Sequence, residues 1–308
     1  MRILFIDTVH HTLKKNLEKK LFRCDTAYKK NKSEIELIIH KYDGLIIRSR
    51  FSIDKQFIDK AKNLKFIARA GSGLENINLS HVKKKKIKCF NAPEGNRKAV
   101  AEHSLGMLLC LLNNINISDT EVRQGKWNRE ANRGLEIGGK TIGIIGFGNN
   151  GSALSELLLG FGTKILAYDK YLKKYPFQSN MQELFKQSDI VSINVPLTEE
   201  TKYLVNKDFI RNFKKPFYLI NTARGKCVNT DDLVSELISG KVLGACLDVL
   251  EYENSSFEKL KNNFVNEEIK HLVKSKKVII TPHIAGWSEQ SNYKIANILT
   301  KKILSNFC

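Results

Sequence analysis

Short aliphatic segments recur at roughly 25-residue intervals through the second half of the chain, and amphipathic stretches separate them. We predict strands at 141–145, 164–168, 190–194, 217–221, 243–248 and 277–281. Strands that alternate with helices form a parallel sheet with helices on both faces, which is the α/β class. Six such strands match a doubly wound, Rossmann-like dinucleotide-binding fold.

The first third of the chain repeats this alternation less regularly. We predict strands at 2–6, 44–48 and 64–69, with helices at 12–22 and 54–61. Residues 98–112 form one long buried helix, and the polar, irregular stretch 113–136 is a linker or an oligomerisation arm. The tail 288–307 is a final helix. A length of 308 residues suggests two domains.

Composition excludes several classes of protein. Hydrophobic residues make up 42% of the chain and there are only 5 prolines, so disorder is not its main theme. The longest apolar run, 105–112, is too short to span a membrane, and the apolar start stops at Asp7, so we expect no signal peptide. Six scattered cysteines without a C-x-x-C pair predict free thiols in a cytoplasmic protein and no bound metal.

The net charge of +19 leaves more than one interpretation. It fits a nucleic-acid partner, a membrane surface, or a field that attracts small anions. Of the 51 basic residues 40 are lysine, whereas base readers and phosphate clamps favour arginine. We therefore predict no nucleic-acid or membrane partner and interpret the tetralysine 83–86 as a solvated loop. Whether the charge has a function stays open.

The strongest local motif is the sequence GIIGFGNNG at 143–151, which follows a predicted strand and opens a helix. Gly146 permits a tight turn, Gly148 lets a pyrophosphate approach the backbone, and Gly151 allows close helix–strand packing. Asp169 follows Gly148 by about 20 residues and ends the next strand, where an acid binds a ribose diol. A carboxylate there repels a 2′-phosphate, so the motif favours NAD over NADP.

Reactive side chains follow three further strands. Arg224 lies in NTARG, acids lie in LDVLEYE from Asp248 onward, and His283 lies in TPHIAG. The carboxyl ends of parallel strands meet at one edge, so these residues predict an acid–base site beside an anion clamp. We interpret the other histidines as structural or solvated: His10, His11, His40, His81, His103 and His271.

Together these motifs resemble the D-isomer-specific 2-hydroxyacid dehydrogenase family, and within it the phosphoglycerate dehydrogenases. The segments RAGSGLENIN at 69–78, NAPEGN at 91–96 and AVAEH at 99–103 share the resemblance, which covers nearly the whole chain. It implies a discontinuous substrate domain, 1–98 with 287–308, around an NAD-binding Rossmann domain, 99–286. It also implies a homodimer paired through 98–112 and the 113–136 arm.

The resemblance assigns three catalytic residues. Arg224 holds the substrate carboxylate and carbonyl oxygen, His283 exchanges a proton with the hydroxyl oxygen, and Glu253 hydrogen-bonds the imidazole. Glu251 competes for the last role, but its spacing from Asp248 favours Glu253.

The resemblance also assigns binding residues, and it places Asp248 near the nicotinamide carboxamide. The expected cofactor contacts are Ser72, Gly146, Gly148, Asn149, Asn150, Gly151, Asp169, Thr201, Thr222, Ala223, Asp248, Ala285 and Gly286. The expected substrate contacts are Ser72, Gly73 and Arg224, with Arg48 or Arg50 reaching a phosphate.

The expected reaction interconverts a D-2-hydroxy acid and a 2-oxo acid with NAD, and 3-phosphoglycerate, the entry point of serine biosynthesis, is the preferred substrate. Glyoxylate, hydroxypyruvate, lactate and erythronate 4-phosphate are alternatives within the class, and an NAD-sensing corepressor-like protein is an alternative outside it. We expect no C-terminal regulatory domain and hence no serine feedback through one. Asn149, Asn150, Trp287 and the long stretch 252–277 depart from the family pattern.

Overall fold

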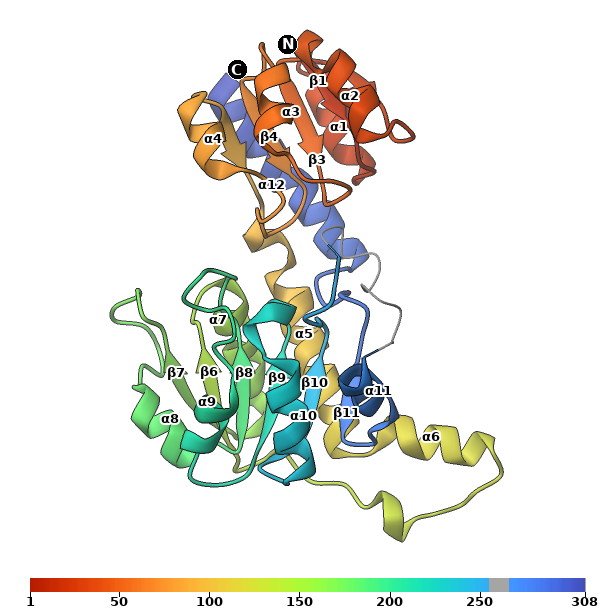
Figure 1. Ribbon diagram of the computed structural model, residues 1–308, viewed down its shortest axis with the longest axis vertical. Helices are drawn as coiled ribbons and strands as arrows, with labels where there is room; N and C mark the ends of the chain where they lie inside the picture. Colours follow the sequence, from red (N-terminus) through yellow and green to blue (C-terminus); the bar gives the residue numbers. More distant parts are fainter. Residues whose placement is uncertain (255–265, 308) are drawn as a thin grey trace. The chain divides into compact units, whose positions relative to one another are not determined.

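The computed structural model describes residues 1–254 and 266–307, and these divide into two compact units (Figure 1). Unit 1 contains Met1–Asn96 and residues 287–307, and unit 2 contains residues 97–254 and 266–286. The long stretch 252–277 lies partly outside the described residues. No helix in the described part is long and apolar enough to cross a membrane.

Unit 1 is built on a five-stranded parallel sheet in the order β2-β1-β3-β4-β5. Its strands are β1 (Arg2–Phe5), β2 (Arg23–Thr26), β3 (Gly44–Ile47), β4 (Phe66–Arg69) and β5 (Lys88–Phe90). The connection from β1 leads to β2 on one side, whereas β3 and the later strands lie on the other side of β1, so the topological switch point lies between β1 and β3. Such a switch point is where open α/β sheets bind ligands.

Helices cover both faces of this sheet. They are α1 (His11–Glu18), α2 (Lys32–Ile38), α3 (Lys55–Lys60), α4 (Leu79–Lys84) and α12 (Glu289–Phe307), with a 3₁₀ turn at Ile39–Lys41. Successive side chains of a strand point to opposite faces of the sheet, so alternate residues pack against the two helix layers. Leu4 and Leu45 pack with α2–α4, whereas Ile3 and Ile46 pack with α1 and α12.

Unit 2 contains a six-stranded parallel sheet in the order β11-β10-β9-β8-β6-β7. Its strands are β6 (Thr141–Ile145), β7 (Lys164–Tyr168), β8 (Ile190–Ile193), β9 (Phe217–Asn221), β10 (Val242–Leu247) and β11 (Val278–Ile280). The switch point lies between β6 and β8. A single bridge between Ala167 and Gln178 adds a rudimentary neighbour beside β7.

The helices of unit 2 also form two layers (Figure 1). α5 (Pro93–Leu112, entering from unit 1) and α7 (Asn149–Leu158) cover one face; α8 (Met181–Gln187), α9 (Lys207–Asn212), α10 (Thr230–Ile238) and α11 (Glu267–Lys274) cover the other. α6 (Ile115–Arg123) follows α5, and 3₁₀ turns lie at Glu130–Asn132, Leu159–Phe161 and Gly225–Cys227.

The α/β class and the parallel sheets agree with the sequence analysis, but several local predictions are wrong. β2 and β5 were not expected, because these short strands at the sheet edges carry too few apolar residues to show a pattern. α6 lies in the stretch predicted to be irregular. The tetralysine is not simply a loop, since Lys83 and Lys84 form the last turn of α4.

Candidate active site

The glycine-rich turn joins β6 to α7 and has the geometry that its sequence predicts. Gly146 has a φ of +88°, which favours glycine, and a Cβ on Gly151 would lie 2.1 Å from the Gly146 carbonyl oxygen. A Cβ on Gly148, by contrast, would meet nothing within 4 Å. The turn is therefore tight where helix and strand pack and open at the N-terminus of α7, where backbone N–H groups suit an anion.

Asp169 ends β7 beside this turn. Its carboxylate accepts hydrogen bonds from the backbone N–H groups of Phe147 (2.8 Å), Tyr171 (2.9 Å) and Leu172 (3.0 Å). Partial burial raises the pKa of Asp169, but these hydrogen bonds outweigh burial, and the net pKa lies below its usual value. Asp169 therefore keeps its negative charge at the mouth of the glycine turn. Glycine turn, helix terminus and acid together fit the phosphates and ribose of a dinucleotide.

His283 sits in a strained turn that Asp248 holds in place. Its φ is +57°, in the left-handed region that non-glycine residues rarely adopt. Its N–H donates to the Asp248 carbonyl (2.8 Å), and the next two N–H groups, of Ile284 (2.8 Å) and Ala285 (2.9 Å), donate to the Asp248 carboxylate. The N–H groups of Ile284 and Ala285 thus form a small anion nest, and the Asp248 carboxylate occupies it.

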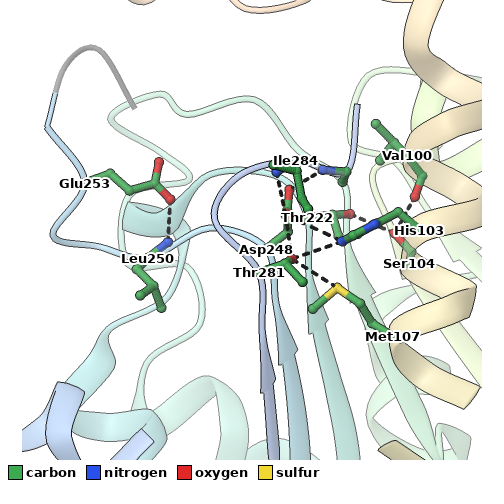
Figure 2. A network of polar contacts seen from close by, with 11 residues as sticks. Val100, His103, Ser104, Met107, Thr222, Asp248, Leu250, Glu253, Thr281 and Ile284 are labelled. Atoms are coloured by element: carbon green, nitrogen blue, oxygen red, sulfur yellow. Dashed lines mark hydrogen bonds and ion pairs between the residues drawn. The ribbon is translucent and has the colours of Figure 1, made fainter. Parts of the chain in front are cut away.

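A polar network supports this nest from α5 (Figure 2). The Thr281 hydroxyl donates to Asp248 Oδ1 (2.6 Å) and contacts His103 Nε2 (3.0 Å), which lies 3.6 Å from the same carboxylate oxygen. Ser104, the next residue on α5, contacts the hydroxyl of Thr222 (3.0 Å) at the end of β9. The helix that begins in unit 1 therefore bonds to the loops that follow β9 and β11.

The two candidate acids have separate partners. Glu253 Oε2 lies 2.7 Å from His283 Nδ1, and its other oxygen accepts the N–H of Leu250 (2.7 Å; Figure 2). Glu251 instead accepts the Tyr203 hydroxyl (2.6 Å) and caps α10 through Thr230. The geometry pairs the imidazole with Glu253, as the spacing predicts; the catalytic role itself stays a prediction.

Arg224 follows β9 in extended backbone geometry, and its Nη1 donates to the Ala223 carbonyl (2.6 Å). The next residue, Gly225, packs so closely that a Cβ would lie 1.9 Å from the Leu250 carbonyl oxygen. The loop that carries Arg224 therefore packs directly against the loop that carries Glu253. Unit 2 thus gathers the predicted catalytic loops along the carboxyl edge of one sheet.

The remaining predicted contacts of unit 2 lie along this edge. Thr222 and Ala223 follow β9, Ala285 and Gly286 follow β11, and Asn149 and Asn150 begin α7. Thr201 lies in a turn after β8, where its hydroxyl donates to the Pro196 carbonyl (2.6 Å).

The predicted substrate contacts of unit 1 lie at its own switch point. The N–H of Arg48 donates to Asp7 Oδ2 (2.5 Å), and the Arg48 guanidinium lies over the Trp287 ring, 3.9 Å from its centroid. The Arg50 guanidinium instead bonds the carbonyls of Tyr28 and Ala27 and lies 3.4 Å from Asp7 Oδ1. The two arginines therefore differ: Arg50 braces the backbone, whereas Arg48 stacks on an exposed indole.

The loop after β4 carries the other predicted contacts of unit 1. The Ser72 hydroxyl donates to Asn96 Oδ1 (2.6 Å), and its carbonyl accepts from the Asn91 amide (2.6 Å). Gly73, the neighbour, is partly exposed.

Two residues of these networks were overlooked in the sequence. His103 was grouped with the structural or solvated histidines, although it lies in the AVAEH segment that already resembles the family. Asp7 served only to exclude a signal peptide, but its place at the carboxyl end of β1 was a usable signal.

Comparison with known proteins identifies the family. The profile of the D-isomer specific 2-hydroxyacid dehydrogenase, NAD binding domain, matches residues 105–285. A hydroxypyruvate reductase of Thermotoga maritima is 37% identical over 88% of this chain and 87% of its own length. A D-3-phosphoglycerate dehydrogenase of Bacillus subtilis is 33% identical over 89% of this chain, which spans only 51% of that relative.

Solved structures agree with this assignment. The D-lactate dehydrogenase of Aquifex aeolicus, crystallised with NAD and lactic acid, superposes with a TM-score of 0.85 at 29% identity and covers 99% of this chain and 95% of its own. The chain belongs to the D-isomer specific 2-hydroxyacid dehydrogenases, NAD-dependent oxidoreductases. The predictions of family, of Rossmann-like α/β fold and of NAD as cofactor are confirmed.

Proposed function

We propose that the protein interconverts 3-phosphoglycerate and 3-phosphooxypyruvate with NAD, the entry reaction of serine biosynthesis. The observation that carries this proposal is Arg48, whose backbone N–H donates to Asp7 at the switch point of unit 1 and whose guanidinium lies over the Trp287 ring. Trp287 follows His283 by four residues along the chain. A guanidinium fixed on an aromatic face suits recognition of a phosphate on the substrate of such an enzyme.

The proposed chemistry divides among three residues of unit 2. Arg224 binds the planar carboxylate through its guanidinium fork and polarises the neighbouring carbonyl oxygen. His283 exchanges a proton with that oxygen through Nε2, the ring nitrogen that does not face Glu253. Glu253 fixes the orientation of the ring through its contact with Nδ1.

We propose that unit 2 binds the cofactor and that unit 1 binds the phosphate end of the substrate. Gly146, Gly148 and the start of α7 would hold the pyrophosphate, and Asp169 the ribose hydroxyls, with its retained charge disfavouring a 2′-phosphate. When bound, NAD supplies or accepts the hydride. Thr281 and His103 keep Asp248 in place, and through it the strained His283 turn.

The test compares two substrates that differ only by the phosphate. We expect faster NADH oxidation with 3-phosphooxypyruvate than with hydroxypyruvate. Arg48→Gln should lower kcat/KM for the phosphorylated acid by about 30- to 160-fold, the loss of one charge-assisted contact of roughly 2–3 kcal/mol, and change hydroxypyruvate turnover little. Arg50→Gln is the matched control, because its guanidinium bonds carbonyl groups and should alter stability but not the substrate ratio.

Hydroxypyruvate is the second candidate substrate. One observation favours it: the Thermotoga maritima relative, a hydroxypyruvate reductase, is 37% identical over 88% of this chain. Turnover of hydroxypyruvate without turnover of 3-phosphooxypyruvate would replace the first proposal with this one. A substrate ratio that depends on Arg50 would overturn the role of Arg48.

We further propose a homodimer formed through the 113–136 arm. Four large apolar side chains of this arm are about half exposed or more: Ile115, Val122, Trp127 and Leu135. Trp127 alone is 78% exposed. Exposed apolar residues grouped on one arm favour burial against a second copy of the chain.

A further inference from the structure

A lysine-lined hollow in unit 1 has no part in the proposed reaction. It is open to solvent and has a volume of about 580 Å³, within the size range of small-molecule sites. Leu64, Asn63, Asp43 and the terminal aromatic residue Phe307 contribute to its lining. The hollow, here called the lysine pocket, is lined by six lysines: Lys41, Lys62, Lys65, Lys85, Lys86 and Lys88.

The lysine pocket lies at the opposite edge of the sheet from the switch point. Its lining residues 41–43, 62–65 and 85–88 directly precede or begin β3, β4 and β5. Because the strands are parallel, their amino-terminal ends all lie on the same side of the sheet, opposite their carboxyl ends. Arg48 and the 71–73 loop follow the carboxyl ends of β3 and β4, about 13 Å away for strands of four residues. The pocket is therefore separate from the proposed substrate site.

Positive charge dominates the lysine pocket. Asp43 is the sole carboxylate among the described lining residues, and it is already bound by Lys65 (3.0 Å) and by the N–H of Arg2 (2.8 Å). Lys41, Lys62, Lys86 and Lys88 make no ion pair within the described part of the chain, and of these four only Lys88 has a side-chain hydrogen bond there. Like charges grouped around one hollow repel each other, so an anion that enters it relieves that repulsion.

The other contacts of the pocket hold its walls in place. Lys85 pairs with Asp59 (2.8 Å), and Lys88 Nζ donates to Asn306 (2.7 Å) and lies 5.4 Å from the Phe307 ring centroid. Phe307 packs in turn against Phe66, with ring centroids 5.1 Å apart. An aromatic side chain thus lies among ammonium groups, which act as point charges toward phosphate.

We propose that the lysine pocket binds a small compound that carries a chain of phosphates, either inorganic oligophosphate or a nucleoside triphosphate. A single phosphate carries at most about two negative charges, fewer than the four lysines that lack an ion pair in the described residues, whereas three linked phosphates carry about three to four. The described lining of the pocket contains no arginine, the residue that nucleic-acid sites favour, and this favours a small phosphate compound over a nucleic acid.

Isothermal titration calorimetry of the whole chain tests the proposal with tripolyphosphate, ATP, inorganic phosphate and a short DNA duplex, at physiological salt. Each titration is repeated with saturating NADH, because the adenosine of ATP could enter the dinucleotide site of unit 2. The variant Lys41→Gln/Lys62→Gln/Lys86→Gln removes the three cations of the lysine pocket that have neither an ion pair nor a side-chain hydrogen bond among the described residues. The control Lys19→Gln/Lys20→Gln/Lys29→Gln removes the same charge from exposed lysines of unit 1 outside the pocket.

We expect tripolyphosphate to bind more tightly than phosphate, to lose about tenfold or more in affinity in the pocket variant, and to change less than about twofold in the control. If ATP binds as tightly as tripolyphosphate, the phosphates alone are recognised. If ATP binds more tightly than tripolyphosphate, its base also contacts Phe307. Equal losses in both variants would mean non-specific attraction and overturn the site. Tighter binding of DNA than of tripolyphosphate would overturn the ligand class. Neither result depends on the reaction catalysed in unit 2.

Discussion

Asp248→Asn tests whether a buried acid positions the proposed catalytic histidine. The Asp248 carboxylate is 2% exposed and accepts the Thr281 hydroxyl and the N–H groups of Ile284 and Ala285. Its carbonyl accepts the His283 N–H. The variant keeps the side-chain shape but replaces one acceptor oxygen with an amide donor.

The magnitude follows from these contacts. Hydrogen bonds to a charged acceptor contribute about 1.5–3 kcal/mol each, and one buried donor left unpaired costs about 1–3 kcal/mol. We therefore expect the free energy of unfolding of the variant to fall by about 3 kcal/mol. The His283 turn has a φ of +57° and loses part of its clamp, so the ring should shift. Misplacement by about 1 Å can lower turnover by about 100-fold.

Urea denaturation and steady-state kinetics on the same preparations measure both effects. Glu251→Gln is the matched control, because Glu251 also accepts three hydrogen bonds, one from Tyr203 and two from Thr230. Both variants should be destabilised, but only Asp248→Asn should lose kcat, with the affinity for NADH little changed.

Two results would refute this reasoning. If kcat of Asp248→Asn stays near that of the wild type while NADH binding weakens tenfold, the carboxylate acts on the cofactor and not on the turn. If Glu251→Gln loses kcat equally, the loss reflects general destabilisation of unit 2.

Three further predictions follow from particular contacts. Gly151→Ala should destabilise unit 2 by about 1–3 kcal/mol in urea denaturation, because its Cβ has no room, whereas Gly148→Ala should fold normally and raise the Kd for NADH. The hydrogen bond to Glu251 raises the pKa of Tyr203 to about 12, above the roughly 10 of an unpaired phenol, so its stabilising effect is complete below about pH 10 and is lost as the pH rises toward 12. The unfolding free energy of the wild type should decline relative to Tyr203→Phe over that range; parallel profiles would contradict this. In sedimentation velocity, Trp127→Ser should shift a dimer toward monomer, and a wild type that is monomeric at micromolar concentration would rule out the proposed dimer.

Local patterns were sufficient where a residue's role depends on its immediate neighbours. The glycine turn of β6 and α7 is one case, since the positive φ of Gly146 and the crowding at Gly151 are set within a few residues. The central strands are another, because buried strands read as aliphatic runs. The edge strands β2 and β5 were not predicted, because they are partly exposed to solvent and their sequences contain no aliphatic run.

Sequence by itself therefore determined the family, the order of the central strands and the preference for Glu253 over Glu251, because each rests on spacing along the chain. Only the tertiary structure decided that His103 joins the Asp248 network, which of two arginines braces a backbone, and where the unpaired lysines gather. These outcomes depend on contacts such as His103 with Thr281, 178 residues apart, and Arg48 with Trp287. Packing brings such residues together, and no local pattern encodes which of several chemically equivalent side chains it will choose.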